Sequence, residues 1–127
     1  MRLLLDTQAF LVLALESGPA LSRKTREQLA DSNNDRLFST ISLTEITIKT
    51  GLKKLALSKE KIGETALEMR LTIISYTPSH ANWLFDLPRH HNDPFDRMLI
   101  ATALAEGVPI VTADPEFKRY KGLSVLW

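Results

Sequence analysis

The sequence predicts an α/β fold, with a central parallel sheet of about four to five strands flanked by helices. Short apolar stretches that suit buried strands alternate along the chain with longer stretches of helical pattern. Such alternation is typical of a parallel sheet that helices cover on both faces. The length of 127 residues, with 44% hydrophobic and 24% charged residues, fits one domain spanning residues 1–127.

The chain opens with a predicted strand and two predicted helices. Arg2–Leu5 is a short apolar stretch and suits a buried strand. Gln8–Glu16 suits a helix, which Gly18-Pro19 ends because these residues favour a turn. Ser22–Asp31 suits a second helix with a serine cap.

The middle of the chain repeats this order. Arg36–Thr40 predicts a second strand, and Ser42–Thr50 predicts a helix that Gly51 closes. Ser58–Leu71 suits another helix. Thr72–Tyr76 is β-branched and apolar, which favours a third strand.

The last third contains the clearest helix. A short helix is expected over Ser79–Leu87, and Asp93-Pro94 then opens a helix that runs to Gly107. That helix is apolar almost all round, so we expect it to be buried. Pro109–Thr112 and Leu123–Leu126 suit a fourth and a fifth strand.

Composition excludes several classes of protein. The chain has no cysteine, which rules out disulfides, thiolate zinc sites and a cysteine nucleophile, and fits a reducing interior. No apolar stretch approaches the roughly 20 residues that span a bilayer. Asp6 interrupts the apolar core that a signal peptide would need. We therefore expect a cytoplasmic protein with no membrane association.

Four acidic residues are the candidate catalytic and metal-binding site: Asp6, Glu45, Asp96 and Asp114. Two of them follow the first and fourth predicted strands, and the other two fall in the first turn of a predicted helix. Ligands of open parallel sheets bind beyond the carboxyl ends of the strands, so all four are expected along one edge. Without these acids, the remaining 16 basic and 11 acidic residues leave a charge of +5, which suits a polyanionic substrate.

Crowded carboxylates repel one another, and a divalent cation removes that conflict. Mg²⁺ prefers oxygen ligands and often binds through one or two carboxylates and substrate phosphate oxygens. Helix capping explains the same residues individually. Asp6 and Asp114 suit caps, and Ser42-x-x-Glu45 fits a capping box. Position alone therefore leaves both interpretations open.

Four segments resemble the motifs of PIN-domain proteins, and more narrowly those of VapC-type toxins from bacterial toxin–antitoxin modules: Leu3–Thr7, Ser42–Ile46 with Lys49, His91–Ala101 and Val111–Phe117. The segment His91-Asn92-Asp93-Pro94-Phe95-Asp96-Arg97 is similar to the H-x-D-P-F-D-R pattern and is the most specific of them. The four motifs occur in the family's order and cover nearly the whole chain.

The resemblance implies a PIN-like three-layer fold and endonucleolytic cleavage of RNA that depends on Mg²⁺ or Mn²⁺. It carries the family's acids to the four candidate residues, one for one. It also implies a cognate antitoxin whose tail covers the acidic pocket, and a homodimer.

Other residues allow two interpretations each. Asp93 suits a helix cap more than a metal ligand, and Arg97 could contact phosphate, an acidic site residue or an ordinary ion-pair partner. The hydroxyl residues beside the acids could orient them or cap helices locally: Thr7, Ser42 and Thr112.

No two of His80, His90 and His91 have the helical spacing of metal ligands, and we expect the last two to lie in a solvated loop. The basic runs around Lys49–Lys61 and Lys118–Lys121 could follow phosphates or simply be solvated. Apolar residues in Leu11–Leu15 and Leu52–Leu57 could face a partner.

Two other functions are compatible with the residues alone. A phosphatase could use Asp6 as a nucleophile, although position 8 is glutamine where such enzymes commonly have a second aspartate. A non-catalytic interaction module could keep the fold without the chemistry. No phosphate-binding glycine loop occurs, which argues against nucleotide binding.

Overall fold

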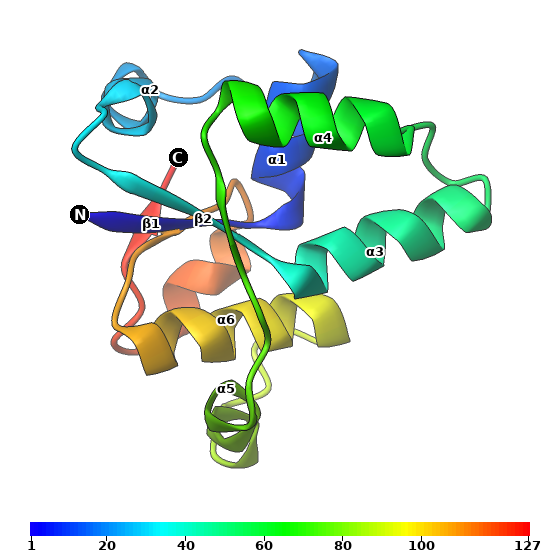
Figure 1. Ribbon diagram of the computed structural model, residues 1–127. Helices are drawn as coiled ribbons and strands as arrows, with labels where there is room; N and C mark the ends of the chain where they lie inside the picture. The colour runs from blue at the N-terminus through cyan, green and yellow to red at the C-terminus, as the bar shows by residue number, and fades with distance from the viewer.

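The computed structural model describes residues 1–127 and contains a five-stranded sheet in which every neighbouring pair is parallel (Figure 1). The strand order is β3-β2-β1-β4-β5. The strands are β1 (Arg2–Leu5), β2 (Asp35–Ser39), β3 (Thr72–Ile74), β4 (Ile110–Val111) and β5 (Val125–Leu126). The predicted α/β class with a parallel sheet is confirmed.

Six α-helices and two 3₁₀ helices connect the strands. They are α1 (Thr7–Leu15), α2 (Arg23–Ala30), α3 (Thr40–Gly51), α4 (Lys59–Glu68), α5 (Pro78–Asn82), η1 (Trp83–Phe85), α6 (Pro94–Glu106) and η2 (Pro115–Arg119). In Figure 1, α1, α2 and α4 lie on one side of the sheet, and α6 lies on the other with α5 beyond it. None of these helices combines the length and the apolar character that a membrane span requires.

The first strand shows why the sheet is covered on both faces. Successive side chains of a strand point to opposite faces. Leu4 packs in the core against α6, whereas Leu3 and Leu5 pack in the core of the α1 and α2 side, and all three are fully buried. An uninterrupted apolar strand therefore fills two cores, as the sequence predicted.

Helix α6 is the main helix of the core on its own side of the sheet. Its buried residues include Leu99, Ile100 and Ala103, which pack with Leu4 and Ile110 from the sheet. Asp93 caps the start of the helix, and Gly107 ends it with a left-handed backbone at φ 65°. The predicted buried helix is confirmed with both of its ends.

The register brings the carboxyl ends of the central strands level. Leu5 pairs with Phe38 on one side and with Val111 on the other. The chain moves from β1 to β2 and β3 in one direction and returns to the other side of β1 with β4. This change of direction leaves the position after β1, which is Asp6, at the switch point where ligands bind in open parallel sheets.

Helix α3 begins earlier than the sequence predicted. Ser39, not Ser42, caps it, because the Oγ of Ser39 accepts the Ile41 N–H at 3.1 Å and the strand ends at that residue. The predicted capping box from Ser42 to Glu45 is therefore wrong, and Glu45 lies in the second turn rather than the first. The predicted helix over Ser79–Leu87 is divided into α5 and η1.

Strand β3 is shorter than expected. It pairs only with β2 and ends at Ile74, and the N–H of Tyr76 instead donates to the Thr40 side chain at 3.2 Å. An edge strand has one partner, and a side-chain acceptor from α3 takes over where that pairing stops.

Candidate active site

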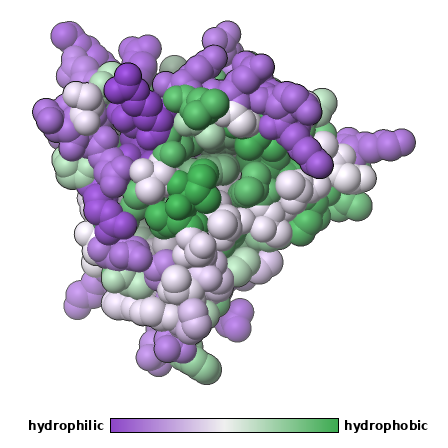
Figure 2. All heavy atoms as spheres, in the orientation of Figure 1, coloured by the Kyte–Doolittle hydropathy of each residue, from purple (hydrophilic) through white to green (hydrophobic).

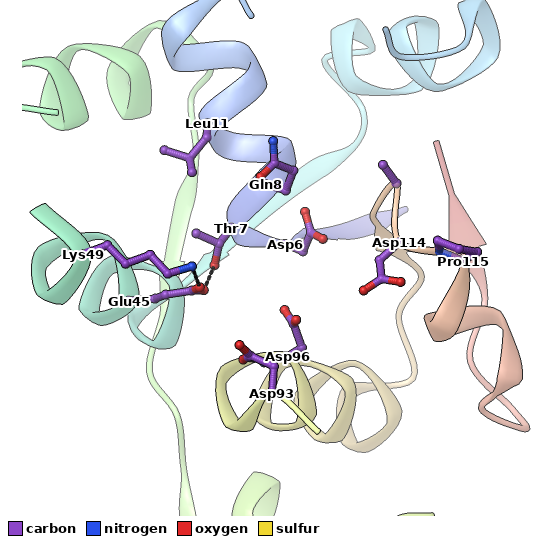
Figure 3. Close-up of a pocket in the computed structure, with 11 residues that line it drawn as sticks. Asp6, Thr7, Gln8, Leu11, Glu45, Lys49, Asp93, Asp96, Asp114 and Pro115 are labelled. Atoms are coloured by element: carbon purple, nitrogen blue, oxygen red, sulfur yellow. Dashed lines mark hydrogen bonds and ion pairs between the residues drawn. The ribbon is translucent and has the colours of Figure 1, made fainter. Parts of the chain in front are cut away.

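The four predicted acids line one cavity of about 370 Å³. The lining residues come from four separate parts of the chain: Asp6, Thr7, Gln8, Leu11, Glu45, Lys49, Asp93, Asp96, Ala113, Asp114 and Pro115. Figure 3 shows the carboxylates of Asp6, Asp96 and Asp114 around a common space. The structure therefore brings all four acids together, at the carboxyl edge of the sheet.

Asp6 is held at the end of β1 by the start of α1. Its Oδ1 accepts the Ala9 N–H at 2.7 Å, so this carboxylate does cap the helix. A hydrogen bond with the Thr112 side chain adds a second contact. Capping and facing the cavity are thus compatible roles of one carboxylate, and the two interpretations of Asp6 do not compete.

Glu45 enters the cavity from the second turn of α3. Thr7 donates its hydroxyl hydrogen to Oε1 of Glu45 at 2.6 Å, and Lys49 forms an ion pair with Oε2 (Figure 3). The hydroxyl of Ser42 lies 3.0 Å from that of Thr7 and extends the same buried network. Both oxygens of Glu45 are thereby fixed, and the residue is only 4% exposed.

Asp96 projects from the first turn of α6. Its backbone N–H donates to Oδ1 of Asp93 at 3.0 Å, so Asp93 is the helix cap that the sequence predicted. Asp93 also lines the cavity and is therefore a fifth carboxylate near the four candidates. The Asp96 side chain remains 25% exposed, which leaves it open to solvent.

Asp114 follows β4 and divides its two oxygens between two partners. Oδ1 accepts the Glu116 N–H at 2.9 Å and caps η2. Oδ2 lies 2.8 Å from Nε2 of His91, and the same nitrogen lies 3.1 Å from Oδ2 of Asp96. His91 therefore stands between two of the predicted acids.

The position of His91 is the main feature that sequence reasoning missed. The run Arg89-His90-His91-Asn92 suggested a solvated loop, yet the His91 side chain is only 15% exposed. The available signal was its place as the first residue of the H-x-D-P-F-D-R pattern. Helical spacing rules could not detect it because the residue lies in a loop before α6.

Burial and mutual repulsion raise the pKa values of two acids of the cavity, Asp6 and Asp96. The pKa of Asp6 is raised to about 6, mainly by burial and also by the nearby charges of Glu45 and Asp114, while hydrogen bonds from Thr112 and Ala9 oppose the shift. The pKa of Asp96 is raised to about 7, first by burial and then by the charge of Asp93, and His91 acts in the opposite direction. These carboxylates are costly to ionise as the protein stands.

The donor set fits a hard divalent cation. Carboxylate oxygens surround the cavity, and Lys49 is the one basic side chain among its lining residues. Mg²⁺ and Mn²⁺ prefer such oxygen ligands, and a cation here would relieve the repulsion that raises the two pKa values. No lysine or arginine forms an ion pair with Asp6, Asp96 or Asp114. Glu45, in contrast, already forms an ion pair with Lys49.

The Arg97 side chain contacts main-chain carbonyl oxygens and forms no ion pair with a carboxylate. Its guanidinium donates to the carbonyl oxygens of Pro88 at 2.9 Å and Leu87 at 3.3 Å, and it approaches that of His91 at 3.5 Å. The residue is buried and holds the loop before α6 against the helix. The expected ion pair is therefore wrong, because Arg97 donates to main-chain carbonyls. Arg97 is also not among the residues that line the acidic cavity.

The other two histidines lie away from the cavity. His80 is buried, caps α5 with Thr77 and pairs with Glu106 at 2.8 Å. His90 packs edge-on against Tyr120 with ring centres 5.0 Å apart. Trp83 and Phe85 are 47% and 88% exposed in this chain.

The fold and this cavity define an α/β protein with an acidic site suited to a divalent cation at the switch point of a parallel sheet. The PIN domain family matches residues 3–123, and the chain belongs to that family. The family resemblance inferred from the motifs is thereby confirmed. A search of curated proteins finds no match.

Three solved structures are similar in fold over nearly their whole length. A chain of VapBC2 from Rickettsia felis, bound to a DNA fragment from its promoter, has 24% identity and a TM-score of 0.74, with 98% of this chain and 97% of that chain covered. DNA-bound VapBC from Salmonella typhimurium has 20% identity and a TM-score of 0.71, with 98% and 96% covered. VapBC-1 from nontypeable Haemophilus influenzae has 20% identity and a TM-score of 0.69, with 98% and 96% covered.

Proposed function

We propose that this protein is a divalent-metal-dependent endoribonuclease, the toxin component of a type II toxin–antitoxin module. The observation that carries the proposal is the convergence of Asp6, Glu45, Asp96 and Asp114 on one cavity, with Asp6 and Asp96 costly to ionise unless a cation is present. Membership of the PIN domain family and similarity in fold to VapBC chains support the same assignment.

In this proposal, Asp6, Asp96 and Asp114 hold Mg²⁺ or Mn²⁺, and Glu45 completes the acidic site. The bound ion would supply Lewis-acid stabilisation of the attacked phosphate and an activated water. The chain's own contribution is to fix the carboxylates. Thr7 and Lys49 hold Glu45 from both of its oxygens, and the Ala9 N–H orients Asp6. Fixed ligands reduce the reorganisation that the reaction requires.

A second hollow supports a polyanionic substrate such as RNA. It has a volume of about 370 Å³ and shares Ala113, Asp114 and Pro115 with the acidic cavity. Lys24 and Lys118 line it, so positive charge lies beside the acidic site. A strand that passes from one hollow to the other would place a phosphodiester at the acids and neighbouring phosphates at the lysines.

The apolar surface beside the cavity supports a protein partner. Leu15 on α1, Ile48 on α3 and Leu52 directly after α3 are 41%, 46% and 61% exposed. The same two helices carry Leu11 and Lys49 of the cavity. Figure 2 shows a separate group of hydrophobic residues between α3, α4 and the edge strand β3. A cognate antitoxin lying on this surface could reach the acidic cavity.

We also propose a homodimer that acts in the cytoplasm.

The decisive experiment incubates the purified protein with structured RNA, with and without Mg²⁺ or Mn²⁺. We expect metal-dependent internal cleavage that Asp6→Asn and Asp96→Asn each abolish. Asp86→Asn is the matched control, because it removes one exposed acidic charge outside the cavity. RNA that stays intact with every metal, in protein shown to be folded, would overturn the proposal.

The same preparation separates the two competing functions. Release of phosphate from small esters with RNA left whole would indicate the phosphatase with an Asp6 nucleophile. That alternative is less favoured because Asp6 is only 4% exposed and one of its oxygens caps α1. An absence of both activities would indicate an interaction module.

A further inference from the structure

We propose that His91 is a positioning residue, which holds Asp96 and Asp114 together through its Nε2–H, and that it is not itself a ligand of the metal ion. The inference rests on the proposed function, since it concerns how the metal site is built. It assigns a role to a side chain that the acidic mechanism leaves unused.

The simplest interpretation of the geometry is the opposite one. His91, Asp96 and Asp114 each offer a ligand atom, and these three atoms lie within 4.8 Å of one another. One nitrogen and two oxygens at such distances could surround a cation. Two hydrogen-bonding distances, 2.8 Å to Asp114 and 3.1 Å to Asp96, are equally compatible with an N–H donor.

The other ring nitrogen separates the two interpretations. Nδ1 of His91 accepts the backbone N–H of Asp93 at 3.1 Å, so it cannot carry a hydrogen without opposing that donor. The hydrogen of the ring is therefore on Nε2, which donates it to Oδ2 of Asp114 and lies 3.1 Å from Oδ2 of Asp96. A histidine that binds a metal through Nε2 must instead present a lone pair there and carry its hydrogen on Nδ1.

The loop fixes the ring in this orientation. The backbone N–H of His91 donates to the Tyr120 hydroxyl at 2.9 Å. The ring packs edge-on against Phe117 with centres 5.7 Å apart and planes at 88°. The Arg97 guanidinium donates to the carbonyl oxygen of Pro88 in the same loop and approaches that of His91. A turned ring would lose the Asp93 contact and both carboxylate contacts, so the tautomer is imposed by the surroundings.

Three residues of the H-x-D-P-F-D-R segment, His91, Asp93 and Asp96, contribute to this one arrangement. Asp93 caps α6 and supplies the N–H that sets the tautomer. The ring donates its hydrogen bond to Asp114, and Oδ2 of Asp96 lies 3.1 Å from the same nitrogen. Because Nε2–H lies between Oδ2 of Asp96 and Oδ2 of Asp114, it offsets part of their repulsion. The two carboxylates are thus held at a fixed spacing before a cation binds.

Nitrogen NMR of the histidine ring tests the tautomer directly. In uniformly ¹⁵N-labelled protein, we expect the His91 signals to show hydrogen on Nε2 in the metal-free state and with saturating Mg²⁺. The His91→Gln spectrum identifies which signals belong to this ring. A switch to hydrogen on Nδ1 when Mg²⁺ binds would overturn the inference.

Metal titration provides the second test. His91→Ala should weaken Mg²⁺ and Mn²⁺ binding by the same factor, about 10- to 100-fold, as loss of an orienting partner does. His91→Gln retains an N–H donor and should recover part of that loss. A nitrogen ligand would favour Mn²⁺ over Mg²⁺, so its removal would weaken Mn²⁺ binding selectively, and that result would also overturn the inference.

Pulsed EPR of bound Mn²⁺ distinguishes failure of the inference from failure of the proposed function. We expect no coupling from a directly bound histidine nitrogen in the wild-type protein. Such a coupling, absent from His91→Gln, would make His91 a ligand and leave the metal-dependent function intact. A wild-type protein that binds neither Mn²⁺ nor Mg²⁺ would overturn both.

Discussion

Thr7 donates its side-chain hydrogen to Oε1 of Glu45 across a distance of 2.6 Å. The contact joins the first turn of α1 to the second turn of α3, and both residues are buried. Because Thr7 follows Asp6 directly, a single hydroxyl couples the carboxylate at the end of β1 to the one that α3 supplies. Residues 38 positions apart are thereby held as one group.

Thr7→Val tests this coupling. Valine keeps the shape of threonine but leaves Glu45 held by Lys49 alone. We expect metal affinity, and RNA cleavage with it, to fall about 10- to 100-fold, since orienting partners of ligands contribute that much. Thr7→Ser is the control, because it retains the hydroxyl and should stay near wild type. Equal Mn²⁺ affinity in the valine variant, measured by calorimetry, would show that the hydroxyl does not position Glu45.

The raised pKa values predict how metal-free stability depends on pH. Unfolded aspartates lose their protons near pH 4, whereas folded Asp6 and Asp96 keep theirs to about pH 6 and pH 7. Between these limits the folded protein binds more protons, so its free energy of unfolding falls as pH rises. The stabilisation is complete below about pH 4 and is lost as pH passes through about 6 to 7. Urea unfolding of metal-free protein from pH 4 to 8 measures the slope.

Asp6→Asn should flatten that dependence and stabilise the metal-free protein above pH 7. Asparagine caps a helix as well as aspartate does, while the buried charge disappears. A shift of about two pKa units corresponds to about 1 to 3 kcal/mol. Asp86→Asn, which changes an exposed residue, should leave the slope as it is. Destabilisation by Asp6→Asn at pH 7.5 would contradict the argument.

Mg²⁺ or Mn²⁺ should raise the melting temperature at pH 7.5 in proportion to saturation of the site. A ligand that binds only the folded state stabilises it by about 2.7 kcal/mol at 100 times its dissociation constant. Asp96→Asn should remove most of this shift. An equal shift in the wild type and in Asp96→Asn, recorded by thermal unfolding with and without chelator, would place the bound ion elsewhere.

Arg97→Lys should destabilise the protein although it keeps the charge. One ammonium group cannot reach the carbonyls of Pro88 and Leu87 as the two guanidinium nitrogens do. Loss of a charged hydrogen bond costs about 2 kcal/mol. Chemical denaturation gives this loss, and hydrogen exchange should show faster opening of the loop before α6. Unchanged exchange there would mean that the loop is held by Tyr120 and Phe117 alone.

Lys24→Glu with Lys118→Glu should weaken RNA binding without changing metal affinity. Each lost phosphate contact reduces the slope of log affinity against log salt by about 0.7 for a single strand. Lys54→Glu with Lys59→Glu, which changes two exposed lysines outside both hollows, is the matched control. Fluorescence anisotropy with Asp6→Asn protein avoids cleavage during the titration. An unchanged salt slope would exclude the second hollow from the RNA path.

Much of the architecture follows from local pattern. The uninterrupted apolar run Leu3–Leu5 can only be a strand with two buried faces, and Asp93-Pro94 with Gly107 marks both ends of α6. The start of α3 was less predictable, because Ser39 and Ser42 are equally good caps in sequence. The end of β2 decides between them, since Ser39 is where the strand's extended backbone gives way to the helix.

The sequence by itself determined the α/β fold, the family and which four acids to consider. Strand burial, helix ends and motifs each depend on residues that are close together in the chain. Only the tertiary structure decided how those acids are held. The alignment of β1 with β2 and β4 brings distant carboxylates to one cavity, turns Arg97 toward the loop's carbonyls and sets the His91 ring between Asp96 and Asp114. Such contacts depend on the relative placement of elements far apart in the chain, which no local pattern specifies.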